Sequence, residues 1–223
     1  MEKPQGIICD LDGTLLDTLE DLADSVNIVL AERGLPVHPV DAYRYFVGDG
    51  APVLITRVLP EERRDAETHA RCLSRFREVY AVRWNVKSRP YEGIVDMLKE
   101  IRRRGIRLAV LSNKPHDATA QCVTELLKEV QFDIVQGQVD GLARKPDPAG
   151  ALAIARSLHL TADQCWYLGD TATDMQTAVS AGMFAVGVAW GFRTRAELEQ
   201  NGARVVLDSP GQLTALLDGD RLP

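Results

Sequence analysis

The sequence predicts an α/β fold, a doubly wound Rossmann-like parallel sheet with an inserted all-helical cap domain. Two observations carry this prediction. Over residues 88–223, short apolar runs typical of buried parallel strands alternate with amphipathic segments of helix length. Residues 16–87 follow the first apolar run and contain no strand pattern. We therefore expect a Rossmann-like core of residues 1–15 and 88–223, and a helical cap domain of residues 16–87.

Length and composition support one α/β domain with a smaller insertion. The chain has 223 residues, of which 45% are hydrophobic, and its formal net charge is −6. The acidic balance argues against nucleic acid as a partner, and no apolar run has the length of a membrane span. The N-terminus enters the first strand without a signal-peptide pattern, and the four cysteines are scattered. We expect reduced thiols and a cytoplasmic protein, either a monomer or a homodimer.

The first elements along the chain are a short strand and a set of helices. Residues 6–9 form an apolar run that ends in two aspartates and a glycine. Apolar residues at helical spacing then predict a helix from Thr18, a plausible N-cap, to Gly34, a plausible stop. Residues 43–59 are helical in pattern except at 48–50, and a long charged helix is expected to start at Pro60.

The remaining elements alternate between helix and strand, which predicts right-handed crossovers. The expected helices cover about residues 94–104, 117–130, 149–158 and 174–181, and the expected strands cover 107–111, 132–135, 164–168, 184–188 and 204–207.

Polar residues recur at the predicted strand ends. Those that follow a strand, or precede a helix on the same side, are Asp10, Asp12, Ser112, Asn113, Lys145, Asp170 and Asp174. Because parallel strands present their carboxyl ends at one edge of a sheet, we expect these side chains to converge.

Such a cluster of carboxylates needs a cation. Two like charges 4 Å apart repel by about 4 kcal/mol at an effective dielectric constant near 20. Oxygen ligands select a hard ion, and a phosphate substrate favours Mg²⁺. Of Asp10 and Asp12, one can attack an electrophile and the other can move protons. Lys145 adds a second cation, and Ser112 with Asn113 suits phosphate oxygens. The sum predicts a phosphoryl-transfer site.

Four of these segments, in this order, resemble the motifs of the haloacid dehalogenase superfamily. They are Asp-Leu-Asp-Gly-Thr-Leu at 10–15, Ser-Asn-Lys at 112–114, Lys-Pro at 145–146 and Gly-Asp-Thr-Ala-Thr-Asp at 169–174. The resemblance covers essentially the whole chain, and the insertion resembles that family's helical cap.

The resemblance implies a role for each residue. Asp10 would attack phosphorus in line, and Asp12 would protonate the leaving oxygen and then activate water. Asp10, the backbone carbonyl of Asp12 and Asp170 would hold Mg²⁺, and Asp174 would support the metal site or Lys145. Ser112, Asn113 and Lys145 would bind the phosphoryl group. Thr14 and the Gly191-Phe192 pair are interpreted as structural.

Further residues indicate which reaction within the family the protein catalyses. Asp12 argues against a dehalogenase, which needs no proton for a leaving oxygen. No lysine lies between Lys3 and Lys87, which argues against a phosphonate-cleaving relative with a cap lysine. A sugar-phosphate mutase stays open. A phospho-accepting receiver module is the non-enzyme alternative, and the length and the large insertion argue against it.

The cap carries the substrate prediction. Gly48, Gly50 and Arg57 resemble the cap loop of phosphoglycolate phosphatases, where flexible amides and a guanidinium could bind a small carboxylate. The alternative is a turn between helices and a solvated arginine. We predict Mg²⁺-dependent hydrolysis of a small phosphorylated metabolite, first 2-phosphoglycolate, through an aspartyl-phosphate. A broad-specificity phosphatase or a pyrophosphatase remains the alternative.

Overall fold

The computed structural model describes residues 3–219 of the chain. The chain divides into two compact units, Met1–Leu16 with Pro90–Pro223 and Asp17–Arg89. In the described part, none of the helices combines the length and the apolar character that crossing a membrane requires.

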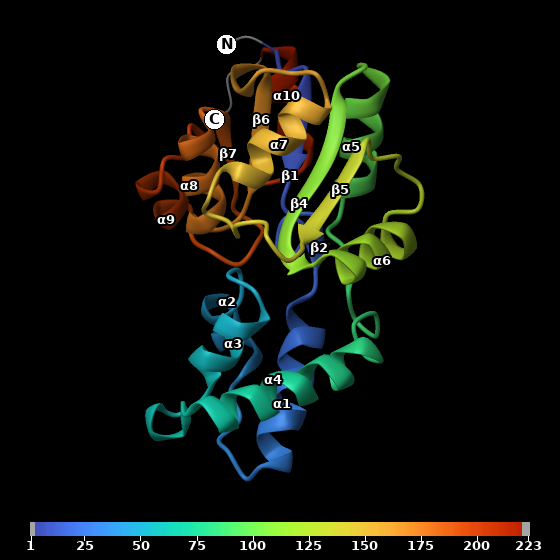
Figure 1. The fold of residues 1–223 in the computed structure, drawn as a ribbon. Coiled ribbons are helices and arrows are strands. Elements are labelled where there is room, and N and C mark those ends of the chain that lie inside the picture. Colours follow the sequence, from blue (N-terminus) through green and yellow to red (C-terminus); the bar gives the residue numbers. More distant parts are fainter. Residues whose placement is uncertain (1–2, 220–223) are drawn as a thin grey trace. The chain divides into compact units, whose positions relative to one another are not determined.

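The first unit is built on a six-stranded parallel sheet with the order β5-β4-β1-β6-β7-β8 (Figure 1). The strands are β1 (Gly6–Cys9), β4 (Arg107–Pro115), β5 (Ile134–Gln138), β6 (Cys165–Gly169), β7 (Phe184–Val188) and β8 (Val205–Leu207). Cys9 at the end of the central strand lies between Val110 of β4 and Leu168 of β6. The residues that follow β1, β4 and β6 therefore emerge side by side at one edge.

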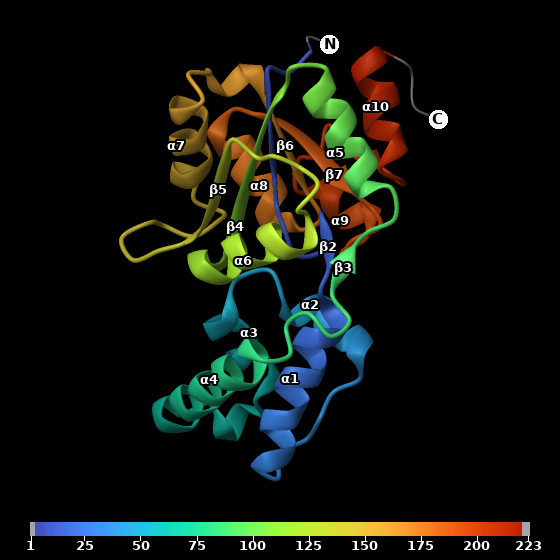
Figure 2. The ribbon, with the colours of Figure 1, turned by 90° about the vertical axis from the view of Figure 1, so that its right-hand side faces the viewer.

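Helices cover both faces of this sheet. They are α5 (Ile94–Arg103), α6 (His116–Leu126), α7 (Ala149–Ser157), α8 (Ala172–Ala181), α9 (Arg195–Gln200) and α10 (Gly211–Asp218), with a 3₁₀ turn at Ala162–Gln164. Apolar residues of α7 and α8, with Leu198 of α9, share a core cluster with Ile8 and Tyr167 of the strands. Figure 2 shows α5 and α10 on the opposite side of the sheet from α7. This two-sided covering explains why all four residues of β1 are buried.

The second unit is helical. It contains α1 (Leu19–Glu32), α2 (Tyr43–Phe46), α3 (Ala51–Val58) and α4 (Ala66–Ala81), with 3₁₀ turns at Val40–Ala42 and Glu61–Arg63. Helices α1 and α4 pack together through buried apolar faces that include Val26 and Phe76. Asp21 is 2% exposed, and its carboxylate accepts hydrogen bonds from the backbone N–H groups of Lys87 and Ser88. This contact ties the two ends of the helical segment together.

The structure corrects several sequence-based boundaries. The long charged helix begins at Ala66 and not at Pro60, because residues 61–63 form a 3₁₀ turn and Asp65 caps the helix by accepting from the Thr68 N–H at 2.9 Å. The helix expected to reach residue 130 ends at Leu126. Thr18 precedes α1, but its side chain makes no capping hydrogen bond.

Two strands also differ from the prediction. Strand β4 continues past Leu111 to Pro115, with a register shift between these residues against β5, so Ser112 and Asn113 lie within the strand and not after it. A two-residue strand β2 (Leu16–Asp17) pairs with β3 (Arg89–Pro90), where the sequence showed no strand. Two residues are too few for an alternating pattern to be visible.

Candidate active site

Three buried aspartates meet at the carboxyl edge of the sheet. Asp10 follows β1, Asp170 follows β6, and Asp174 lies in the first turn of α8. Each offers one carboxylate oxygen, and these oxygens lie within 4.8 Å of one another. Asp10 is 6% exposed, and the other two are fully buried. Three carboxylates that lie this close together and are shielded from solvent repel one another strongly unless cations neutralise their charge.

Lys145 supplies part of that compensation. Its ammonium nitrogen lies 2.7 Å from Asp10 Oδ1 and 2.7 Å from Asp174 Oδ1, and its side chain is almost fully buried. One ammonium against three carboxylates leaves two negative charges, which is the charge that a divalent cation neutralises. Carboxylate oxygens are the ligands that hard ions such as Mg²⁺ prefer. The residues present therefore fit a divalent metal ion.

Neighbouring groups hold two of the aspartates in fixed orientations. Asp170 accepts from the Thr14 hydroxyl at 2.8 Å and from the Phe192 N–H at 2.8 Å. Asp174 accepts from the Thr171 hydroxyl at 2.7 Å and from the Thr171 N–H at 3.1 Å, which also caps α8. Such outer contacts orient carboxylates before any ligand arrives.

Burial sets the protonation of this cluster. Desolvation, followed by the charge of Asp174, raises the pKa of Asp10 well above its ordinary value, although Lys145 opposes the shift. The same two causes raise the pKa of Asp170 to about 7. Burial by itself would lower the pKa of Lys145, but the charges of Asp10 and Asp174 outweigh burial and raise it. Lys145 therefore stays charged, while the metal-free cluster retains protons up to neutral pH.

Metal binding must displace those protons, so we expect the Mg²⁺ affinity to rise with pH. Below the pKa of Asp170, about 7, each pH unit should weaken binding by roughly tenfold for one released proton. Calorimetric titration of the protein with MgCl₂ at pH 6 and pH 8, in buffers of different ionisation enthalpy, measures both the affinity and the proton release. Equal affinities at the two pH values, without proton release, would contradict this assignment.

The remaining core residues of the predicted site surround this cluster. Asn113 exchanges two hydrogen bonds with the backbone of Lys145, at 3.0 and 3.2 Å, and so fixes the loop that carries the lysine. Ser112 is buried, and its hydroxyl accepts from the Lys114 N–H at 3.2 Å. Asp12 lies outside the three-aspartate group, and its Oδ1 is 2.7 Å from the ammonium of Lys114. The structure thus brings all seven core residues to one sheet edge, where Asp10 and Asp174 pair with Lys145 and Asp12 pairs with Lys114.

Two glycines make room for Asp170, a role that the sequence did not predict for them. A Cβ on Gly13 would lie 2.3 Å from Asp170 Oδ2, and a Cβ on Gly191 would lie 2.3 Å from Asp170 Cβ. Gly13 also has a φ of +89°. Thr14 and Phe192, which we interpreted as structural, bind Asp170 directly. The sequence placed Gly13 at the turn after the Asp-x-Asp motif and Gly191 in a structural pair, but it did not show that both lie against Asp170.

Replacing Gly13 should therefore damage the metal site. We expect Gly13→Ala to lower stability by about 1–3 kcal/mol and to weaken Mg²⁺ binding at least about tenfold, because the new methyl group displaces the Asp170 carboxylate. Gly105→Ala is the matched control, since Gly105 also has a positive φ, +74°, but its Cβ would meet nothing within 4 Å. Calorimetric Mg²⁺ titration of both variants checks this. A Gly13→Ala variant with unchanged affinity would contradict the steric argument.

The predicted cap residues lie in the helical unit. Gly48 and Gly50 have φ values of +117° and +89° in the loop between α2 and α3. Arg57 is engaged locally, since its guanidinium lies 2.5 Å from Asp49 Oδ2 and donates to the Phe46 carbonyl at 3.1 Å. These two contacts brace the loop. The arginine is therefore held within its own unit and is not simply solvated.

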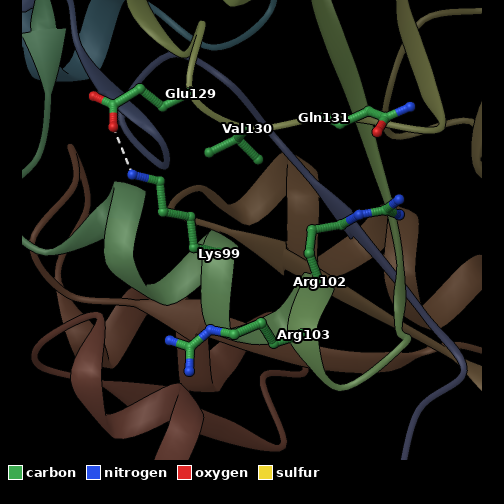
Figure 3. A pocket seen from close by; sticks show the side chains of 6 residues that line it. All are labelled: Lys99, Arg102, Arg103, Glu129, Val130 and Gln131. Atoms are coloured by element: carbon green, nitrogen blue, oxygen red, sulfur yellow. Dashed lines mark hydrogen bonds and ion pairs between the residues drawn. The ribbon is translucent and has the colours of Figure 1, made fainter.

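A separate surface pocket of about 350 Å³ lies away from this edge. Figure 3 shows it between the end of α5 and the segment that precedes β5, lined by Lys99, Arg102, Arg103, Glu129, Val130 and Gln131. It therefore lies near the amino ends of β4 and β5. Carboxylates already pair its three cations, Lys99 with Glu129, Arg102 with Asp133 and Arg103 with Glu100.

The fold and the site place the protein among the doubly wound α/β proteins that gather a buried acidic group, able to hold a metal ion, at the carboxyl edge of the sheet. The chain belongs to the haloacid dehalogenase-like hydrolases, because residues 7–188 match the model of that family. A phosphoglycolate phosphatase of Rhodospirillum rubrum is 36% identical over 233 residues, which cover 98% of this chain and 95% of the relative. One of Pseudomonas savastanoi pv. phaseolicola is 32% identical and covers 97% of this chain and 81% of the relative.

Solved structures agree with this assignment. A candidate phosphoglycolate phosphatase from Lactobacillus delbrueckii subsp. bulgaricus superposes with a TM-score of 0.92 at 32% identity, covering 97% of this chain and 99% of that one. The fold class and the family resemblance predicted from the sequence are both confirmed.

Proposed function

We propose that this hydrolase is a Mg²⁺-dependent phosphomonoesterase that acts through an aspartyl-phosphate on Asp10. The observation that carries the proposal is the pairing of Asp10 with Lys145 at 2.7 Å, inside a group of three buried carboxyl groups that this one ammonium does not neutralise once all three are ionised. A nucleophile beside a permanent cation and a divalent-metal site is the arrangement that in-line phosphoryl transfer requires.

In this proposal Asp10, the backbone carbonyl of Asp12 and Asp170 hold the Mg²⁺. When bound, the ion would neutralise charge on the phosphoryl oxygens and hold the reacting group in line. Asp174 keeps Lys145 aimed at Asp10 through its own 2.7 Å contact. Lys145, Ser112 and Asn113 take the phosphoryl group, where Lys145 offsets the charge that develops on the oxygens.

Asp10 would attack phosphorus and form the covalent bond, while Asp12 gives a proton to the departing oxygen. Asp12, now ionised, would then remove a proton from the water that cleaves the aspartyl-phosphate. Asp12 suits this exchange because its side chain is 20% exposed, whereas that of Asp10 is 9% exposed.

We propose 2-phosphoglycolate as the first substrate to test. The near-full-length relatives named as phosphoglycolate phosphatases support this choice. So does a cap loop in which Gly48 and Gly50 have positive φ values and carry no side chain that would block the approach of a small carboxylate. Arg57 already pairs with Asp49. We therefore propose that Arg57 holds the shape of this loop, in addition to contacting the substrate.

Phosphate release from a panel of esters tests the proposal. The panel contains 2-phosphoglycolate, sugar phosphates, nucleoside monophosphates and pyrophosphate, each with Mg²⁺ and with a chelator. We expect chelator-sensitive release with a preference for 2-phosphoglycolate. Weak activity of similar size on every ester would agree with the proposed mechanism but would contradict 2-phosphoglycolate as the preferred substrate. Phosphate retained on the protein without release would favour a receiver module or a mutase.

A further inference from the structure

We propose that Lys114 is a positioning residue that holds the Asp12 carboxylate at the leaving-group side of the site and away from the metal group. The inference rests on the proposed function and deepens it. Lys114 is 8% exposed, and its ammonium lies 2.7 Å from Asp12 Oδ1. The two residues are 102 positions apart in the chain, so the fold itself creates this pair.

The backbone of Lys114 is held in place by hydrogen bonds of its own, independently of the contact that its side chain makes. Its N–H donates to Ser112 Oγ at 3.2 Å, and its carbonyl accepts from Thr119 Oγ1 at 3.2 Å. Residues 112–114 continue the buried run of β4, which extends from Leu108 to Lys114. The Cα of Lys114 is thus fixed in position, and its ammonium group has little conformational freedom.

The two lysines of the site divide the carboxylates between them. Lys145 binds Asp10 and Asp174, which belong to the metal group, and Lys114 binds Asp12, which does not. A loose Asp12 side chain, two residues from Asp10, could turn towards a bound cation and become a ligand. A nearly buried ammonium needs a hydrogen-bond acceptor beside it, because an unpaired charge in that position is costly, and Asp12 Oδ1 can accept whether or not the carboxyl carries a proton. Lys114 therefore draws Asp12 towards itself.

Proton transfer by Asp12 depends on that orientation. Comparing leaving groups that need a proton with those that do not therefore separates a positioning role of Lys114 from a purely structural role. In single-turnover experiments we expect Lys114→Met to slow phosphorylation of Asp10 by an alkyl phosphate at least about tenfold, because an alkoxide needs a proton as it departs. With p-nitrophenyl phosphate the slowing should stay below about threefold, since that leaving group departs unprotonated. Lys114→Arg should recover part of the rate, and Lys99→Met is the matched control at the distant surface pocket.

Other kinetic outcomes would overturn the inference. A raised KM with unchanged kcat would make Lys114 a substrate contact. Equal slowing with both leaving groups would make it a structural residue.

A crystal structure of Lys114→Met with Mg²⁺ tests the same inference without an activity measurement. We expect the Asp12 carboxylate to leave its present position, and an unmoved Asp12 would overturn the inference. If the wild-type protein released phosphate from no ester, the proposed function would fail, and this structure would still decide the role of Lys114.

Discussion

Asp10→Asn should abolish turnover while leaving the fold intact. An amide cannot attack phosphorus, and loss of a catalytic nucleophile lowers turnover by roughly 10⁴-fold or more. The fold should survive, because the carboxylate is held in a repulsive cluster. Burial and Asp174 raise its pKa, so the neutral amide removes an unfavourable charge. Steady-state phosphate release and thermal unfolding of the metal-free protein measure the two effects.

Glu129→Gln is a suitable control, since Glu129 lines the distant surface pocket and pairs with Lys99. It should keep wild-type turnover. An Asp10→Asn variant with more than about a hundredth of wild-type activity, after deamidation has been excluded by mass spectrometry, would show that another group is the nucleophile.

Lys145→Met should have the largest effect on stability. Removing the ammonium leaves Asp10 and Asp174 buried without their shared partner, and breaking a buried pair in this way costs about 3–5 kcal/mol. Turnover should fall by roughly 10³-fold, because the charge on the transferred phosphoryl group loses a fixed cation. Chemical denaturation of the metal-free variant, together with phosphate release at saturating Mg²⁺, measures both.

The stability loss of Lys145→Met should depend on pH in a defined direction. Without Lys145 the folded pKa of Asp10 rises further above its unfolded value, so the folded protein holds the extra proton. The variant therefore loses stability as pH increases, and its deficit should be smaller at pH 5 than at pH 8. Lys99→Met, which breaks an exposed pair, should cost under about 1 kcal/mol at both values. A pH-independent deficit would contradict the electrostatic account.

Much of the fold was readable from the sequence because its signals are local. The first strand, residues 6–9, and the strand at 184–188 were predicted with their observed bounds. Apolar runs of that length between turn residues have few other interpretations. The start of the helix at Ala66 was missed, since the charged segment after Pro60 suits a 3₁₀ turn as well as a helix.

The candidate site was predictable to the extent that parallel strands share an edge. That argument places Asp10, Asp170 and Lys145 together before any coordinates are known. It does not say which carboxylate pairs with which lysine. The Asp12–Lys114 pair joins residues 102 positions apart, and the room for Asp170 depends on Gly191, 21 residues further on. Both are properties of three-dimensional packing that a single sequence does not display.

Trapping the covalent intermediate tests the central claim most directly. The protein is mixed with Mg²⁺ and a good phosphate ester, quenched in acid within the first turnovers, and digested for peptide mass spectrometry. We expect one added phosphoryl group on the peptide that contains Asp10, and none in Asp10→Asn. Steady phosphate release with no phosphorylated peptide, or with the phosphoryl group on another residue, would contradict the aspartyl-phosphate mechanism.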